Sequence, residues 1–66
     1  MLVVINGKKT ELPDEITLAD MLTQRKLNPE TVLIEYNGEL VPKELWPGVV
    51  LNDGDRLEIL RFVGGG

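Results

Sequence analysis

The sequence contains no cysteine and no histidine among its 66 residues. Without cysteine there is no disulfide to brace a small core and no thiol for redox chemistry. Without either residue, metal sites built on thiolate or imidazole are excluded, and so is every nucleophile–histidine pair. The composition therefore predicts a binding or carrier module and not an enzyme.

Long apolar runs and an excess of positive charge are missing as well. No stretch approaches the ~20 apolar residues of a membrane span, and no basic segment or cleavage site suggests a signal peptide. The net charge of −4 argues against nucleic acid as a partner, because phosphate contacts need clustered cations. An acidic surface suits a basic protein partner, or serves solubility alone. We expect a cytoplasmic module without a membrane segment.

The first residues of the chain predict two strands joined by a tight turn. Leu2–Ile5 is a β-branched run that ends at Asn6-Gly7, the strongest two-residue hairpin signal. Residues 8–12 then predict a polar returning strand near a sheet edge.

A helix is predicted over residues 17–26. Thr17 suits its N-cap, and Asn28-Pro29 is expected to end it. Three apolar residues at one-turn spacing are its predicted contribution to the core: Leu18, Met21 and Leu22.

The second half repeats the hairpin pattern and ends in a strand. Val32–Tyr36 and residues 39–41 flank a second hairpin signal, Asn37-Gly38, and residues 56–63 form the last predicted strand. Between them, Lys43–Gly48 reads as a turn or short helical piece whose Trp46 is predicted to pack against the sheet.

One amphipathic helix on one small mixed sheet of four to five strands gives an α+β two-layer domain. A hairpin followed by a helix that crosses the sheet is the β-grasp arrangement, in which the first and last strands lie parallel in the middle. We predict a β-grasp domain over residues 1–63 and a flexible glycine tail over residues 64–66.

Several short stretches, spread over nearly the whole chain, resemble the ThiS family of sulfur carriers in thiamine biosynthesis. They are Tyr36-Asn37-Gly38-Glu39, Val41-Pro42, Trp46, Leu51-Asn52-Asp53-Gly54-Asp55, Leu57-Glu58-Ile59 and the glycine-rich end. The tail has three glycines, where the family needs two. The resemblance implies a ubiquitin-like β-grasp fold. It also implies that a ThiF-like enzyme adenylates the terminal carboxylate of Gly66, which then becomes a thiocarboxylate.

The resemblance assigns the remaining parts of the reaction to partners. ATP and magnesium would belong to the adenylating enzyme, and no cofactor or metal would be bound by this chain. A sulfur donor such as a cysteine desulfurase would supply the sulfur, and a ThiG-like thiazole synthase would receive it.

Glycine suits such a tail for steric reasons. Without Cβ atoms, Gly64 and Gly65 can pass a narrow channel and deliver Gly66 to an active site. Three extended residues reach about 10 Å. The α-carboxyl group has a pKa near ~3.5 and is a poor electrophile as an anion, so it needs activation.

The alternation of side chains along the strands predicts a docking face. If Val32 and Leu57 face the helix, the side chains of Leu33, Leu60 and Phe62 face outward. These three residues would form an exposed apolar patch, rimmed by acids, that binds partners.

Other functions remain open at this point. The chain could carry sulfur for molybdopterin or another metabolite, or it could be a ubiquitin-like modifier linked to lysines. A non-covalent β-grasp interaction module is a further possibility, although the acidic charge disfavours it.

Overall fold

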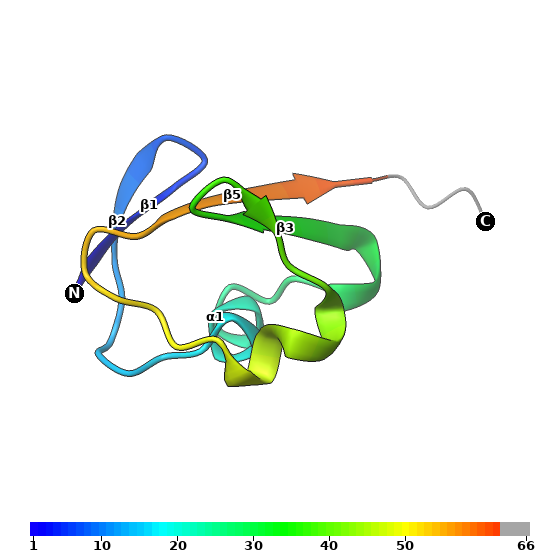
Figure 1. Cartoon of the computed structure of the whole chain (residues 1–66), viewed down its shortest axis with the longest axis horizontal. Coiled ribbons are helices and arrows are strands. Elements are labelled where there is room, and N and C mark those ends of the chain that lie inside the picture. The colour runs from blue at the N-terminus through cyan, green and yellow to red at the C-terminus, as the bar shows by residue number, and fades with distance from the viewer. Residues whose placement is uncertain (63–66) are drawn as a thin grey trace.

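In the computed structural model, which describes residues 1–62, five strands form one mixed sheet and one α-helix packs on a face of it (Figure 1). The elements in chain order are β1 (Leu2–Ile5), β2 (Lys8–Glu11), α1 (Leu18–Gln24), the 3₁₀ helix η1 (Pro29–Thr31), β3 (Val32–Tyr36), β4 (Glu39–Leu40), the 3₁₀ helix η2 (Lys43–Gly48) and β5 (Arg56–Arg61).

The strand order is β2-β1-β5-β3-β4. The first and last strands, β1 and β5, are neighbours and run parallel, while the other three pairings are antiparallel. The predicted α+β class and β-grasp arrangement are therefore confirmed, with five strands, and β2 lies at a sheet edge as expected.

Both hairpin signals form the predicted turns. Asn6 and Gly7 have φ values of 50° and 80°, and Asn37 and Gly38 have values of 50° and 90°. Two successive positive φ angles define the tight turn whose twist matches that of the flanking strands. Each turn thereby fixes the register of its hairpin, in which the residues on either side of the turn pair directly.

The helix starts as predicted. Thr17 is its N-cap, and the hydroxyl oxygen of Thr17 accepts a hydrogen bond from the backbone N–H of Asp20 at 3.0 Å. This bond satisfies one of the backbone donors that the first turn of a helix leaves without a partner.

The predicted end of the helix is wrong by two residues. The helix stops at Gln24 and not at residue 26, because Lys26 adopts a left-handed conformation with φ 57°. Asn28-Pro29 does not end α1. Instead, the side chain of Asn28 accepts a hydrogen bond from the N–H of Glu30 at 2.9 Å and caps η1.

Three strands also end earlier than predicted. The returning strand stops at Glu11 and not at residue 12, and β4 stops at Leu40 and not at residue 41. The last strand ends at Arg61, and Val63 lies outside the described residues.

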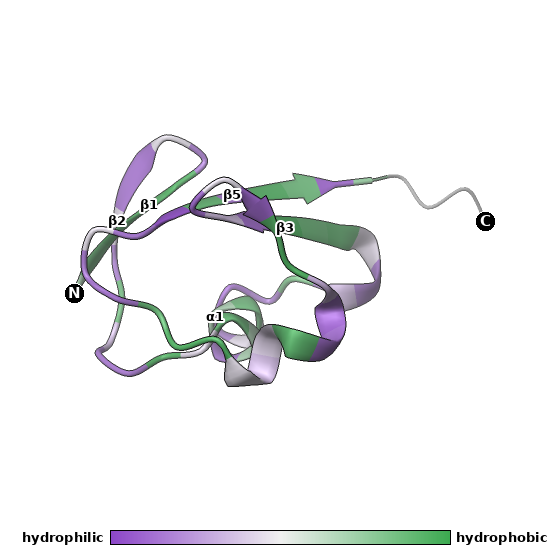
Figure 2. Cartoon of the chain, in the orientation of Figure 1, coloured by the Kyte–Doolittle hydropathy of each residue, from purple (hydrophilic) through white to green (hydrophobic). Residues whose placement is uncertain are grey.

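The core lies between the sheet and the layer formed by α1 and η2. The three helix residues predicted for the core are at most 2% exposed. Trp46 is 4% exposed and donates a hydrogen bond from Nε1 to the carbonyl oxygen of Val41 at 3.0 Å, so its predicted packing role is confirmed. Figure 2 shows that β3 and β5 are apolar over most of their length, whereas the edge strand β2 is polar.

A side-chain network ties the β3–β4 turn to the loop before β5. The carboxylate of Asp55 accepts hydrogen bonds from the Tyr36 hydroxyl at 2.7 Å, the Asn37 amide at 3.2 Å and the backbone N–H of Asn52 at 2.8 Å. Burial raises the pKa of Tyr36, and the hydrogen bond to Asp55 together with its negative charge raises that pKa further.

This network predicts a stability change at alkaline pH. Because the pKa of Tyr36 is higher in the folded state than in the unfolded chain, its stabilisation is present below pH ~10 and is lost as the pH rises through the folded value. We expect Tyr36→Phe to lower the free energy of unfolding by about 1 kcal/mol at neutral pH. The variant should also lose less stability than the wild type between pH ~9 and pH ~11.

Urea unfolding at several pH values measures both effects. The chain has one tyrosine, so the ultraviolet absorbance of tyrosinate reports its ionisation directly. An equal alkaline loss of stability in the wild type and in Tyr36→Phe would contradict the prediction.

Candidate functional site

The predicted reactive group lies at the C-terminal end of the chain. Gly64, Gly65 and Gly66 lie outside the described residues, so the geometry of the site is given up to Phe62. The prediction for these three glycines stays a prediction. The strand that leads to them, β5, has β1 on one side and β3 on the other.

Asn6 fastens β5 from the side of β1. Its amide donates to the carbonyl oxygen of Ile59 at 3.2 Å and accepts from the backbone N–H of Ile59 at 2.7 Å. This pair of bonds continues the β1–β5 ladder beyond Ile5, where β1 itself turns away. The sequence predicts a turn residue at Asn6, and no local signal shows that its amide reaches a strand 53 positions away.

β3 and its approach hold the other side of β5. The ladder between β3 and β5 runs from Tyr36↔Leu57 to Val32↔Arg61. One residue further, the backbone N–H of Phe62 donates to the carbonyl oxygen of Thr31 at 3.0 Å. The backbone is therefore fixed up to the last described residue.

The predicted division between inward and outward side chains is confirmed. Leu57 is fully buried and Ile59 is 8% exposed, whereas Leu60 and Phe62 are 50% and 44% exposed. Leu33, which is 45% exposed, lies directly opposite Leu60 in the β3–β5 ladder. The structure thus brings Leu33 and Leu60 together as an exposed apolar pair on the outer face of the sheet, and Phe62 follows at the end of β5. We call these three residues the apolar patch.

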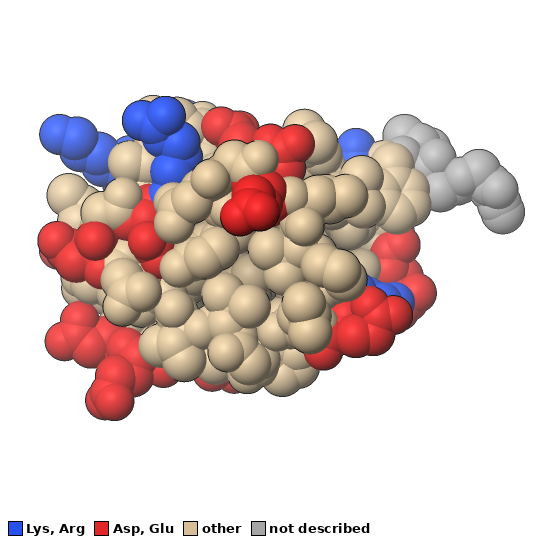
Figure 3. Space-filling model, in the orientation of Figure 1, with Lys and Arg blue, Asp and Glu red and all other residues tan. Residues whose placement is uncertain are grey.

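Acidic residues adjoin the apolar patch. Glu35 and Glu58 lie directly opposite each other in the same ladder, one outward position away from Leu33 and Leu60. Like charges in this arrangement disfavour the sheet slightly. Figure 3 shows acidic side chains spread over the visible face, while most of the basic ones gather toward the β1–β2 hairpin at the upper left.

Within residues 1–62 no group of three or more acidic, histidine or cysteine side chains is arranged to hold a metal ion. In the same part of the chain, no helix is long and apolar enough to cross a membrane. In residues 1–62 the structure thus places the exposed apolar patch on the outer face of the sheet, toward the end of β5.

Fold and site together define a small β-grasp protein that presents an apolar patch beside its C-terminal end. A model of the ThiS family matches residues 3–66, which is nearly the whole chain. The chain therefore belongs to the ThiS family, whose members are sulfur carrier proteins of thiamine biosynthesis and not enzymes.

Individual relatives agree with this assignment. The chain is 40% identical over 63 residues to the sulfur carrier protein ThiS of Bacillus subtilis, and the match covers 94% of this chain and 96% of that one. It superposes on the crystal structure of the thiamine biosynthesis protein ThiS from Geobacter metallireducens with a TM-score of 0.87, over the full length of both chains at 32% identity.

A third relative is much longer. The thiazole synthase of Paramagnetospirillum magneticum is 39% identical over 66 residues. The match covers the whole of this chain and 20% of that protein. The chain thus spans one fifth of that relative.

The register of β5 predicts that neighbouring residues differ sharply in their contribution to stability. We expect Ile59→Ala to lower the free energy of unfolding by about 2–4 kcal/mol, because it removes a buried side chain from the core. Leu60→Ala should cost less than about 1 kcal/mol, since half of that side chain is already exposed.

Denaturant unfolding measures the loss of stability in each variant. Each variant serves as the control for the other, because both substitutions shorten an aliphatic side chain of the same size to alanine. Similar losses for both variants would contradict the predicted difference in burial, and a larger loss for Leu60→Ala would mean that β5 is shifted by one residue relative to its neighbours.

Proposed function

We propose that this chain carries sulfur as a thiocarboxylate on Gly66. The match to the ThiS family extends through residue 66 and therefore includes the glycine tail, and this observation carries the proposal. The sequence has neither a cysteine thiol nor a histidine, so a side-chain persulfide on this chain is ruled out. The terminal carboxylate is the group that can accept the sulfur.

The carboxylate must first become an electrophile. Its oxygen attacks the α-phosphorus of ATP, pyrophosphate leaves, and an acyl adenylate forms. A sulfur nucleophile then attacks the carbonyl carbon and AMP departs with the electrons of the broken bond. If the sulfur comes from an enzyme persulfide, the resulting acyl disulfide is reduced by a second thiol. The net change is one sulfur in place of one oxygen.

Three partners share this chemistry in our proposal. A ThiF-like enzyme binds ATP and magnesium and adenylates Gly66, and a cysteine desulfurase is the source of the sulfur. A ThiG-like thiazole synthase accepts the sulfur. The thiazole synthase of Paramagnetospirillum magneticum supports the last assignment, because it contains a segment similar to this whole chain. We place these steps in the cytoplasm, where ATP is available to the activating enzyme.

The apolar patch is proposed as the surface that docks on these partners. Leu33, Leu60 and Phe62 are each about half exposed and lie where β5 leads into the tail. An enzyme that admits the tail into a channel must approach this end of the sheet. Burying the apolar patch would then help to offset the ordering of the glycines.

The first test records the intact mass of the untagged chain. After incubation with the ThiF-like enzyme, ATP, a cysteine desulfurase and cysteine, we expect a mass shift of one sulfur replacing one oxygen. Omitting ATP should abolish the shift, which controls for adventitious sulfur. An unchanged mass under conditions that convert Bacillus subtilis ThiS would refute the proposal.

The second test separates the tail from the fold. Deleting Gly65 and Gly66 should abolish activation, since the reactive carboxylate no longer reaches the partner's active site. The melting temperature should stay unchanged, because every contact described for the core lies within residues 1–62. A clear drop in melting temperature would instead assign a structural role to the tail.

A further inference from the structure

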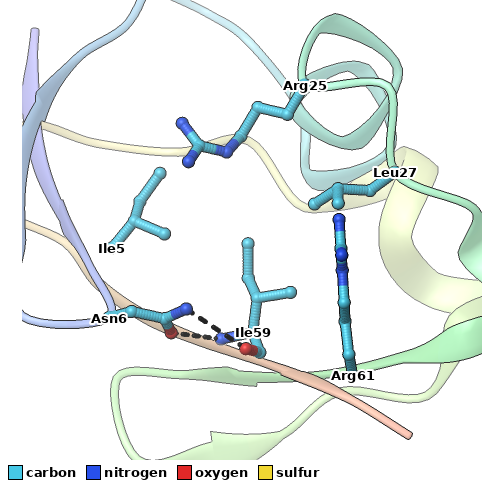
Figure 4. A pocket seen from close by; sticks show the side chains of 6 residues that line it. All are labelled: Ile5, Asn6, Arg25, Leu27, Ile59 and Arg61. Atoms are coloured by element: carbon cyan, nitrogen blue, oxygen red, sulfur yellow. Dashed lines mark hydrogen bonds between the residues drawn. The ribbon is translucent and has the colours of Figure 1, made fainter. Parts of the chain in front are cut away.

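A groove opens on the inner side of β5, opposite the apolar patch. It lies between the end of α1, the turn after β1 and the last residues of β5, and has a volume of about 600 Å³. Six residues line it, namely Ile5, Asn6, Arg25, Leu27, Ile59 and Arg61 (Figure 4).

The groove exists because β5 extends past the helical layer. Leu57 and Ile59 point toward the helix and are covered, and Arg61 is the next side chain on that face. The helix has already ended at Gln24, so Arg61 reaches up toward Leu27 at an open end of the two layers (Figure 4). An inward position of β5 is thus occupied by a cation.

The floor of the groove is apolar and its walls are cationic. Ile5 and Ile59 are almost fully buried, whereas Arg25 and Arg61 are exposed and direct their side chains into the groove, Arg25 from just after α1 and Arg61 from β5 (Figure 4). Within residues 1–62 neither guanidinium forms an ion pair or a side-chain hydrogen bond. Among the described residues no carboxylate lines the groove, and the amide of Asn6 is already bonded to Ile59.

Two guanidinium groups on one groove repel each other, and an anion placed between them is attracted by both. Each guanidinium offers five N–H donors in a planar fork that matches a carboxylate. In a chain with a net charge of −4, this groove is a local exception to the acidic surface. Its apolar floor suits the methylene groups of an acidic side chain better than a fully hydrated inorganic anion.

We propose that the groove of Arg25 and Arg61 binds a glutamate or aspartate side chain of the protein that receives the tail. The proposal rests on the proposed function, because it assumes a protein that approaches the C-terminal end. Arg61 and Phe62 are consecutive residues, with Arg61 on the inner face of the sheet and Phe62 on its outer face. The partner therefore holds the end of β5 from both sides, with an apolar contact on the outer face and a carboxylate in the groove.

Kinetics with the ThiF-like enzyme provide the first test. ATP–pyrophosphate exchange is measured as a function of carrier concentration for Arg25→Glu, Arg61→Glu and Arg61→Lys. Each charge reversal should raise the KM for the carrier about ten-fold with kcat nearly unchanged, because the contact steers docking and not chemistry. Arg61→Lys should retain part of the affinity, and added salt should weaken the wild type more than the reversed variants.

Arg56→Glu is the matched control. Arg56 is an exposed arginine at the opposite end of the same strand, so its reversal changes the net charge equally without touching the groove. An equal increase in KM for Arg56→Glu would show a general charge effect and overturn the proposal. Circular dichroism of each variant checks that the fold is intact, and Arg25→Gln and Arg61→Gln repeat the test without an added negative charge.

A titration followed by NMR tests the groove independently of sulfur transfer. The probe is a capped Leu-Glu-Leu-Glu peptide added to the ¹⁵N-labelled chain, with a Leu-Gln-Leu-Gln peptide and inorganic phosphate as the other arms. We expect shifts at Arg25, Leu27 and Arg61 with the glutamate peptide, and none in Arg25→Gln/Arg61→Gln.

Three outcomes of the titration would overturn the proposal. Equal shifts with the glutamine peptide would mean that the carboxylate is not recognised, and stronger binding of phosphate would indicate a site for small anions. Arginine signals that move when Gly65 and Gly66 are deleted would mean that the chain's own terminal carboxylate occupies the groove. If the enzyme does not activate the wild type, the proposed function fails. The titration still shows whether the groove binds a carboxylate side chain.

Discussion

The register of β5 between β1 and β3 is the constraint on which the rest of the molecule depends. With Leu57 and Ile59 turned toward the helix, Leu60 and Phe62 must face outward, and a slip of one residue would exchange the two sets. The register is held from both sides. The amide of Asn6 bonds both backbone groups of Ile59, and the β3 ladder continues to the N–H of Phe62. The buried core and the outer face are thus two results of the same pairing.

This arrangement separates the parts that stabilise the domain from the parts proposed to act. The turn network around Asp55, the N-cap of the helix and the side chain of Trp46 each form hydrogen bonds within the domain. In the described residues no buried side-chain polar atom is left without a partner. The apolar patch and the cationic groove, in contrast, keep exposed groups whose interactions the domain itself does not satisfy. Exposed groups of this kind favour association with other molecules.

Most of the fold could be predicted from local sequence signals. The two Asn-Gly turns, the Thr17 cap and the alternation along β3 and β5 each depend on a few neighbouring residues, and all are confirmed. The predicted end of the helix is two residues too late, because the sequence signal is Pro29, whereas Lys26 already adopts a left-handed conformation. The hydrogen bonds of Asn6 to Ile59, and the presence of Arg25 and Arg61 on one groove, involve residues more than 30 positions apart, so local patterns do not reveal them. The chemical role of the glycine tail is implied by the resemblance to the family, and the tail lies outside the described residues.

The energetics of docking show why an apolar contact alone is a weak basis for recognition of the tail. Ordering three glycines costs on the order of 3–6 kcal/mol of backbone entropy. Each side chain of the apolar patch is already about half buried, so covering the remainder contributes roughly 1 kcal/mol apiece. The three side chains together contribute about 3 kcal/mol, which at most cancels the cost of ordering the glycines. The loss of translational and rotational freedom on association remains to be offset. Net affinity therefore depends on further contacts outside the apolar patch. The end of the central strand β5 offers one candidate on its inner side, where two guanidinium groups face a groove that no carboxylate of residues 1–62 fills.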